Sequence, residues 1–282
     1  MDLSKLSDAI FLSFTNKLEK KGNNIISVGV NALSQLETIK KFQKMEGLEK
    51  TICLIPEDSF RGEIEKGLSS TNIKLEKKYF YESDPTLLTK RIEKITKYDR
   101  RKQNLVDEIK RVEESNEFNK EKIIENLEKK DTLGKVNFDS VIISAFDETL
   151  KSITTSLIYT DVTPKKTYFI TLNQWFDESL LNEDSSQNLY FPSVNKKNFD
   201  EFKQEYFKKY SSEPNQISLL GFDMVGLIFY LSKVNNFQLN NKIFDQKNTF
   251  KGKIGLFEIE DKRIKHVLNF YKVENNKFKK IF

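Results

Sequence analysis

TICLIPEDSF, residues 51–60, is the stretch of this 282-residue chain that decides its fold. Residues 51–55 form an apolar run of strand length, and Pro56 ends it. Glu57, Asp58 and Ser59 follow with polar side chains that can accept hydrogen bonds from the free N–H groups at the start of a helix. The stretch therefore predicts a strand, a surface turn and a helix, which together make one βα unit.

Similar units fill most of the chain, because apolar runs of strand length alternate with helical patterns. This alternation is typical of an α/β protein with parallel sheets flanked by helices. A helix over 34–45 would place Leu36, Ile39 and Phe42 on one face, and Ser34 with Glu37 predicts a capping box at its start. The other expected strands are residues 10–14, 25–30, 74–80, 141–145, 168–172 and 189–191.

Residues 86–131 differ in composition from the rest, since 24 of these 46 residues are charged and the two signs are mixed. Apolar residues recur at roughly heptad spacing, which predicts a long helix or a helical hairpin with a turn near residues 115–116. In the hairpin, four apolar residues would pack back on the first arm: Phe118, Ile123, Ile124 and Leu127. Two interpretations remain open: a protruding partner-binding arm, and a solvated insertion that covers a sheet.

The last third of the chain predicts two helices and a small sheet. An aromatic stripe over 199–210, expected in the core, is followed by the linker 211–215 and an apolar helix over 216–233. Strands at 256–260, 264–273 and 278–282 would then form a terminal β-meander.

The composition limits the classes of partner. Charged residues make up 32% of the chain, and the 47 basic and 42 acidic residues are interleaved, so the net charge of +5 forms no concentrated basic face for nucleic acid. The best apolar run, 217–231, falls short of the roughly 20 residues of a membrane span and is interrupted by Gly221, Asp223 and Gly226. The first residues also lack the pattern of a secretory signal. Neither nucleic-acid binding nor a transmembrane segment is expected.

Catalytic and metal-binding signatures are not found. The sequence has no phosphate loop, dinucleotide fingerprint, nucleophile elbow or His/Cys metal spacing. His266, the sole histidine, is expected at the surface or at a pocket rim rather than as a general base, and Cys53 is interpreted as a small buried hydrophobe. The Asp-Glu pairs at 147–148 and 177–178 fit helix N-terminal caps. No enzyme activity, cofactor or metal is therefore expected.

Three motifs resemble those of type I periplasmic binding proteins. FKGKIG at 250–255 precedes an apolar and acidic strand, an acidic turn with Arg263 and the closing strand FYKV at 270–273. GFDMVG at 221–226, after a linker that contains a proline, is similar to the family's Gly-Tyr-Asp-Ala helix start. The turn PEDSF at 56–60 is similar to the family's Asp-x-Tyr-Gly turn at the ligand cleft.

Two further features resemble the lipoprotein activators of penicillin-binding proteins, particularly their α-proteobacterial forms. SFTN at 13–16 is followed by Val-Gly-Val at 28–30 and by Gln35, and YDRR at 98–101 leads into a Glu-rich stretch. Family members open with a further βαβα portion, preceded by an export signal and a lipidated cysteine. The resemblance therefore implies a first lobe that is incomplete at its start.

The implied fold is a two-lobed, type I periplasmic-binding-protein-like α/β fold with parallel sheets flanked by helices and a charged helical insertion in the second lobe. The expected division is a partial lobe one over 1–47, lobe two over 48–213 with the insertion at 86–131, and a return to lobe one with the β-meander over 214–282.

By the same resemblance, the Ser-Phe-Thr segment of lobe one and the turn of lobe two face each other across a ligand cleft at the carboxyl ends of strands. Phe60 stands where the family has tyrosine, which weakens the case for hydrogen bonding to an amino-acid ligand. The candidate ligand-binding residues are Ser13, Thr15, Asn16, Ser59, Phe60, Phe146, Asp147 and Trp175.

The resemblance implies a non-catalytic envelope protein that activates a peptidoglycan synthase, a penicillin-binding protein, through surface contact. The alternative is a periplasmic solute-binding protein for an amino acid or a similar small molecule. A shortened product without function is a third hypothesis. The first two place the protein in the periplasm or cell envelope.

Overall fold

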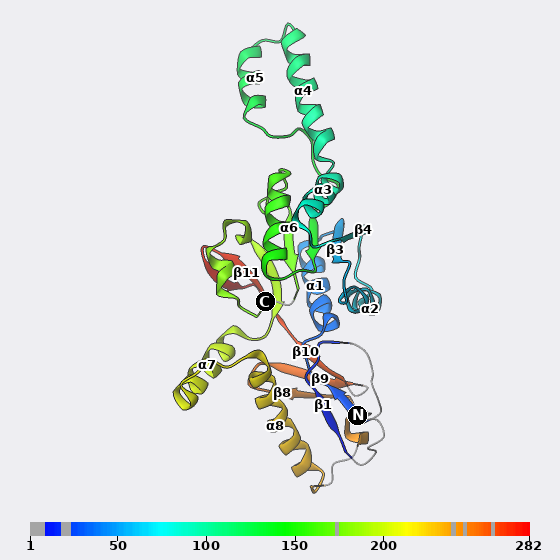
Figure 1. The fold of residues 1–282 in the computed structure, drawn as a ribbon, viewed down its shortest axis with the longest axis vertical. Helices are drawn as coiled ribbons and strands as arrows, with labels where there is room; N and C mark the ends of the chain where they lie inside the picture. Colours follow the sequence, from blue (N-terminus) through cyan, green and yellow to red (C-terminus); the bar gives the residue numbers. More distant parts are fainter. Residues whose placement is uncertain (1–8, 18–23, 173–174, 238–240, 245–246, 261–262) are drawn as a thin grey trace.

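The computed structural model describes residues 9–17, 24–172, 175–237, 241–244, 247–260 and 263–282. Its strands form two mixed sheets, each flanked by helices (Figure 1). In sheet order, the five-stranded sheet contains β1 (Phe11–Ser13), β2 (Ile25–Ser27), β10 (Arg263–Val267), β9 (Leu256–Glu260) and β8 (Asn248–Lys251). The seven-stranded sheet contains β12 (Lys277–Lys280), β11 (Asn269–Glu274), β7 (Leu189–Ser193), β6 (Tyr168–Thr171), β5 (Ser140–Ile143), β3 (Thr51–Pro56) and β4 (Lys77–Tyr81).

The helices confirm the predicted α/β class. We call the five-stranded sheet with its helix the small lobe and the seven-stranded sheet with its helices the large lobe. The α-helices are α1 (Ala32–Glu46), α2 (Arg61–Thr71), α3 (Pro85–Thr96), α4 (Tyr98–Glu114), α5 (Lys120–Glu128), α6 (Asp147–Tyr159), α7 (Lys196–Tyr210) and α8 (Gln216–Val234). Short 3-10 helices are η2 (Glu178–Asn182), η3 (Asp184–Ser186) and η4 (Asn241–Phe244).

β3 shows why the large lobe has helices on both faces of its sheet. All six of its residues are buried, and successive side chains of a strand point to opposite faces. Ile52 and Leu54 join the core formed with α3 and α6, whereas Cys53 and Ile55 join the core formed with α1 and α2. The interpretation of Cys53 as a buried hydrophobe is confirmed, and burial raises the pKa of its thiol to about 12.

The start of α1 differs from the predicted capping box. Asn31 is the N-cap, and its side chain accepts a 3.0 Å hydrogen bond from the backbone N–H of Ser34. Ser34 is instead within the helix, where its hydroxyl accepts a bond from the N–H of His266. The prediction was wrong because the helix begins at Ala32, two residues before the start at Ser34 that its apolar spacing predicts.

α8 covers the five-stranded sheet with one face. Met224, Leu227 and Leu231 pack on Ile26 and Phe257, while Phe222, Val225 and Phe229 lie exposed on the other side. Within the described residues, α8 is the one helix long and apolar enough to cross a membrane by length and composition. Core helices of soluble proteins share this length and composition.

The expected terminal β-meander is divided between the lobes. Residues 264–273 form two strands, β10 in the small lobe and β11 in the large lobe, with the buried Leu268 between them. The chain also passes between the sheets after β2 and through the linker 211–215. The prediction was wrong because β10 and β11 both alternate like one continuous strand, and the sequence carries no signal for a change of sheet.

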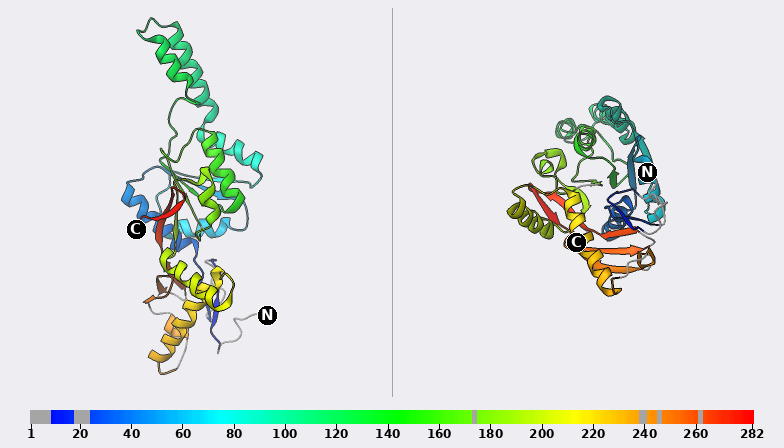
Figure 2. Two further views of the ribbon diagram at one scale, coloured as in Figure 1. Left: turned by 90° about the vertical axis from the view of Figure 1, so that its left-hand side faces the viewer. Right: turned by 60° about the horizontal axis from the view of Figure 1, so that its bottom comes forward.

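From α4 onward, the charged insertion at 86–131 forms a helical hairpin that projects away from both lobes (Figures 1 and 2). Its first part, α3, instead packs on the large sheet through Leu88 and Ile92. Lys97, with a φ of 53°, ends α3 and separates it from α4. Leu105, Val112 and Leu127 are buried between α4 and α5, as the hairpin predicts. Phe118 is 91% exposed rather than packed, because it lies in the turn before α5. The hairpin therefore covers neither sheet.

The aromatic stripe of α7 is only partly in the core. Phe202 is buried and Phe199 packs beside it, but Phe207 and Tyr210 are exposed. The expectation of a core stripe was wrong for the second half of α7, which extends beyond the large sheet (Figure 1).

Candidate functional site

A cavity of about 500 Å³ lies between the two lobes. Its walls come from the β1–β2 region and the start of α8 on one side, and from the loops that follow β3, β5 and β6 on the other. The lining residues are Phe14, Thr15, Asn16, Gly29, Val30, Phe60, Phe146, Asp147, Trp175, Gln216, Ile217 and Leu220. We call this cavity the cleft.

Gly29 holds the Thr15 segment of the small lobe in place. The N–H of Gly29 donates a 3.1 Å hydrogen bond to the carbonyl oxygen of Thr15, and a Cβ on Gly29 would overlap that backbone. The N–H of Lys17 donates to the Thr15 hydroxyl at 3.2 Å. Glycine is therefore required for the close approach that brings Phe14, Thr15 and Asn16 to the cleft.

The turn after β3 presents Phe60 to the cleft. The carboxylate of Asp58 accepts a 2.7 Å hydrogen bond from the N–H of Phe60, and this bond sets the turn ahead of α2. Arg61 points away, since its guanidinium stacks over Phe80 at 3.9 Å and pairs with Glu57 and Glu65. The apolar ring of Phe60, and not the neighbouring cation, therefore reaches the cleft.

Phe146 and Asp147 stand at the start of α6. Phe146 is the N-cap and makes no side-chain capping bond, and its ring meets that of Phe60 edge to face at 5.8 Å. Asp147 has a φ of 50°, a left-handed conformation that Asp and Asn tolerate better than most residues. Its neighbour Glu148 turns outward and pairs with Lys151 at 3.1 Å. Of the pair at 147–148, only Asp147 faces the cleft.

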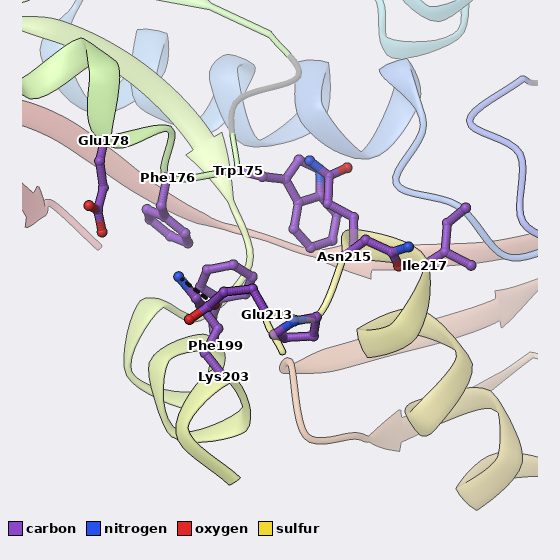
Figure 3. Close-up of a pocket in the computed structure, with 10 residues that line it drawn as sticks. Trp175, Phe176, Glu178, Phe199, Lys203, Glu213, Asn215 and Ile217 are labelled. Atoms are coloured by element: carbon purple, nitrogen blue, oxygen red, sulfur yellow. Dashed lines mark ion pairs between the residues drawn. The ribbon is translucent and has the colours of Figure 1, made fainter. Parts of the chain in front are cut away.

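Trp175 separates the cleft from a second cavity of about 660 Å³. Gln216 and Ile217 also line both cavities. In Figure 3 the indole lies between Phe176 and the side chains of Asn215 and Ile217, facing the linker that enters α8. The second cavity also contains Phe199, Glu178 and the ion pair between Lys203 and Glu213, whose atoms are 3.1 Å apart. We call it the side cavity.

Six of the eight candidate residues line the cleft: Thr15, Asn16, Phe60, Phe146, Asp147 and Trp175. Ser13 and Ser59 do not line it. Ser13 lies in β1, where its carbonyl accepts the N–H of Val28, and Ser59 lies in the turn that Asp58 organises. A role in ligand contact stays a prediction for all eight.

Sequence reasoning missed the other half of the lining. Gln216, Ile217 and Leu220 come from the first turns of α8, and Asn215 caps that helix by accepting the N–H of Ser218 at 2.8 Å. The proline in the linker ahead of α8 is part of the resemblance to type I periplasmic binding proteins. Nothing in the sequence of residues 216–220 itself indicates a ligand site.

His266 is buried, which contradicts the expected surface or pocket-rim position. β10 lies between β2 and β9, so the imidazole points into the small lobe, with Nε2 3.0 Å from the carbonyl oxygen of Val28. Burial lowers the pKa of His266. The prediction was wrong because the alternation of polar and apolar residues in a strand does not show which of its two faces other elements will cover. In the folded protein the face that carries His266 is covered.

The described lining of the cleft is mostly apolar. Asp147 is the one charged side chain among its described lining residues, and that lining contains no histidine, cysteine or lysine. Asp177, of the other acidic pair, caps η2 by accepting the N–H of Ser179 at 2.9 Å, as expected for a helix cap. In the part of the chain that the structure describes, no group of three His, Cys, Asp or Glu side chains could hold a metal ion.

Solved structures with the same architecture are solute-binding proteins. A leucine-, isoleucine-, valine-, threonine- and alanine-binding protein from Brucella ovis, in a closed conformation, superimposes with a TM-score of 0.61 at 13% identity, over 97% of this chain and 69% of that one. The fold is that of the type I periplasmic binding proteins.

Two further structures agree. A substrate-binding protein of an ABC transporter from Desulfitobacterium hafniense, in complex with Leu, matches at a TM-score of 0.60 and 10% identity, over 99% of this chain and 75% of that one. A solute-binding protein of an ABC transporter from Rhodopseudomonas palustris, in complex with 3,4-dihydroxybenzoic acid, matches at a TM-score of 0.56 and 10% identity. The match covers 96% of this chain and 69% of that one. No protein-family model matches the sequence, and no curated protein matches it either. The narrower resemblance to penicillin-binding protein activators is not part of what these structures show.

Proposed function

We propose that this chain is a non-catalytic solute-binding protein that encloses an amino acid or a similar small organic molecule between its lobes. The observation that carries the proposal is the cleft of about 500 Å³, to which both lobes contribute. Small-molecule sites are typically of this size and lie between lobes or domains. The chain crosses between the sheets at three places, so hinge closure on a ligand is compatible with its topology.

The matched solute-binding proteins support this function better than activation of a peptidoglycan synthase. They also support action in the periplasm, outside the cytoplasmic membrane. The proposed ligand contacts are the six candidate residues in the cleft together with Gln216.

A thermal-shift screen of the full chain tests the proposal. The panel contains amino acids, aromatic acids, sugars and alkylammonium compounds at millimolar concentration, and hits are measured by calorimetry. A ligand at 100 times its Kd stabilises the folded state by about 2.7 kcal/mol. Phe146→Ala should weaken binding of a hit at least about tenfold, whereas Phe207→Ala on the exposed side of α7 should not. A panel without hits, or a hit indifferent to Phe146, contradicts the proposal.

One observation keeps a role in envelope interactions as a second candidate. The α4–α5 hairpin projects from the large lobe (Figure 2). Phe118 lies in the turn between these two helices, and its side chain is exposed. Exposed apolar side chains on a protruding element are typical of partner contacts. Capture of a bifunctional peptidoglycan synthase by the chain, and its loss with Phe118→Ser, would support this candidate. No capture by the unmodified chain would count against it.

A further inference from the structure

The cleft is lined by aromatic rings and one carboxylate, without a described cation. Phe14, Phe60, Phe146 and Trp175 contribute rings from four separate segments, and Asp147 contributes the carboxylate. Phe146 is 42% exposed and Phe14 is 38% exposed, so both rings present open surface. In a chain with 47 basic and 42 acidic residues, a negative cavity of this kind differs from the average surface.

The described basic residues next to the cleft in sequence do not line it. Arg61 follows Phe60 but is held over Phe80 by its stacking and by its two glutamate partners. Lys17 follows Asn16 and is exposed outside the lining. Among the described residues that line the cleft, none carries a positive charge.

Helices α1, α2, α6 and α8 all begin beside the cleft, and a helix N-terminus favours an anion because it carries partial positive charge. Asp147 and Glu63 already place carboxylates in the first turns of α6 and α2, where acidic residues are stabilised. At α1 and α8 the caps Asn31 and Asn215 accept backbone N–H groups. Each of these N-termini therefore already faces an acceptor of the protein's own.

The side cavity is also lined by aromatic rings and acidic side chains. It shares Trp175, Gln216 and Ile217 with the cleft and adds the ring of Phe199. Its cation, Lys203, is paired with Glu213, which leaves the exposed Glu178 as a further negative group. The side cavity (Figure 3) and the cleft thus both combine aromatic surface with negative charge.

Resting on the proposed solute-binding function, we infer that the cleft binds an organic cation of the alkylammonium class, with its charged head among Phe60, Phe146 and Trp175 and facing Asp147. Aromatic faces attract cations through the ring quadrupole, and cages of aromatic residues recognise quaternary ammonium groups. A desolvated alkylammonium loses less hydration than a primary ammonium, and a single carboxylate balances its charge. The leucine and dihydroxybenzoic acid bound to the matched structures carry carboxylates, so this ligand class differs from theirs.

Calorimetry with matched ligands tests the inference. Choline and tetramethylammonium are titrated into the full chain beside 3,3-dimethylbutan-1-ol, the neutral carbon isostere of choline. We expect choline to bind at least about tenfold more tightly than the isostere. Equal or weaker binding of choline would overturn the inference.

Two variants assign the contacts. Asp147→Asn keeps a residue that tolerates the positive φ and removes the charge, and Phe146→Leu keeps apolar volume and removes the ring. Each should weaken choline binding at least about fivefold. Glu148→Gln removes the same charge from the adjacent residue, whose side chain is 86% exposed. It should change the Kd for choline by less than about twofold. Equal losses for Asp147→Asn and Glu148→Gln would overturn the role of Asp147.

A second panel separates this inference from the proposed function. Leucine, valine and dihydroxybenzoic acid are titrated in parallel. Binding of these acids without binding of the cations would overturn the cation class and leave solute binding intact. Binding of neither set, together with an empty broad screen, would overturn the proposed function and this inference with it.

Discussion

Asp223 in α8 accepts a 2.6 Å hydrogen bond from the backbone N–H of Lys253. The other carboxylate oxygen accepts the N–H of Ile254 at 3.0 Å. These bonds join GFDMVG and FKGKIG, two motifs that carry the family resemblance and lie about thirty residues apart. Burial raises the pKa of Asp223, and the two N–H groups offset part of the cost of burying its charge.

Asp223→Ala should lower the free energy of unfolding by about 2–4 kcal/mol, because two buried N–H groups lose their acceptor. Urea denaturation at constant pH measures the change. Asp223→Asn, which can still accept one bond, should lose less than the alanine variant. Equal losses for both would show that the bonds to Lys253 and Ile254 contribute little.

Gly252→Ala should also destabilise the small lobe, because an added Cβ would overlap the carboxylate of Asp223 and approach Phe257. Gly226→Ala is the matched control. A Cβ at Gly226 meets nothing within 4 Å, so alanine there should raise stability by about 0.5–1 kcal/mol through helix propensity. The two melting temperatures should shift in opposite directions, and parallel shifts would contradict the packing described.

Gly29→Ala should weaken ligand binding as well as stability, since it displaces the backbone of Thr15 at the cleft. Gly62→Ala, where an added Cβ has open space in α2, should leave the Kd almost unchanged and should not lower stability. A loss of stability at Gly29 without any change in the Kd of a confirmed ligand would argue that the Thr15 segment is outside the binding site.

His266 should make folding sensitive to acid. Its pKa is lowered by burial, so below about pH 6.5 the unfolded chain takes up a proton that the folded chain resists. Stability is thus retained above that pH and lost as pH falls, by up to about 1.4 kcal/mol per pH unit from this group. His266→Gln, which keeps a donor for the carbonyl of Val28, should show a shallower loss between pH 7 and pH 5. An identical pH slope would exclude His266 as the cause.

Arg101 should determine how firmly the hairpin is held. Its buried guanidinium donates to the carbonyl of Thr96 at 3.0 Å, to the Thr132 hydroxyl at 3.0 Å and to the carbonyl of Thr160. Arg101→Met should lower the unfolding free energy by about 2–4 kcal/mol and speed amide exchange in α4 and α5. The exposed Arg100→Met serves as control and should change neither. Equal effects would show that the buried network is not what anchors the hairpin.

Much of the large lobe follows from local pattern. Residues 51–56 are buried on both faces of the sheet, where β3 has parallel neighbours, and their sequence is therefore almost entirely apolar. The helices beside this strand each carry one apolar face. The hairpin at 98–128 follows from its apolar spacing within a charged background. In the cleft, Thr15, Phe60 and Asp147 were predictable because each follows or precedes a readable strand.

Long-range packing decided the rest. Contacts with distant segments determine three features: the split between β10 and β11, the burial of His266 and the position of Gln216 in the cleft. Such contacts do not produce a periodic pattern in the sequence. The sequence by itself determined the α/β class, the hairpin and half of the cleft lining, because hydrophobic period and turn chemistry are local properties. Only the tertiary structure placed aromatic rings from four segments and one carboxylate in the lining of a single cavity, since that cavity exists only where the two lobes meet.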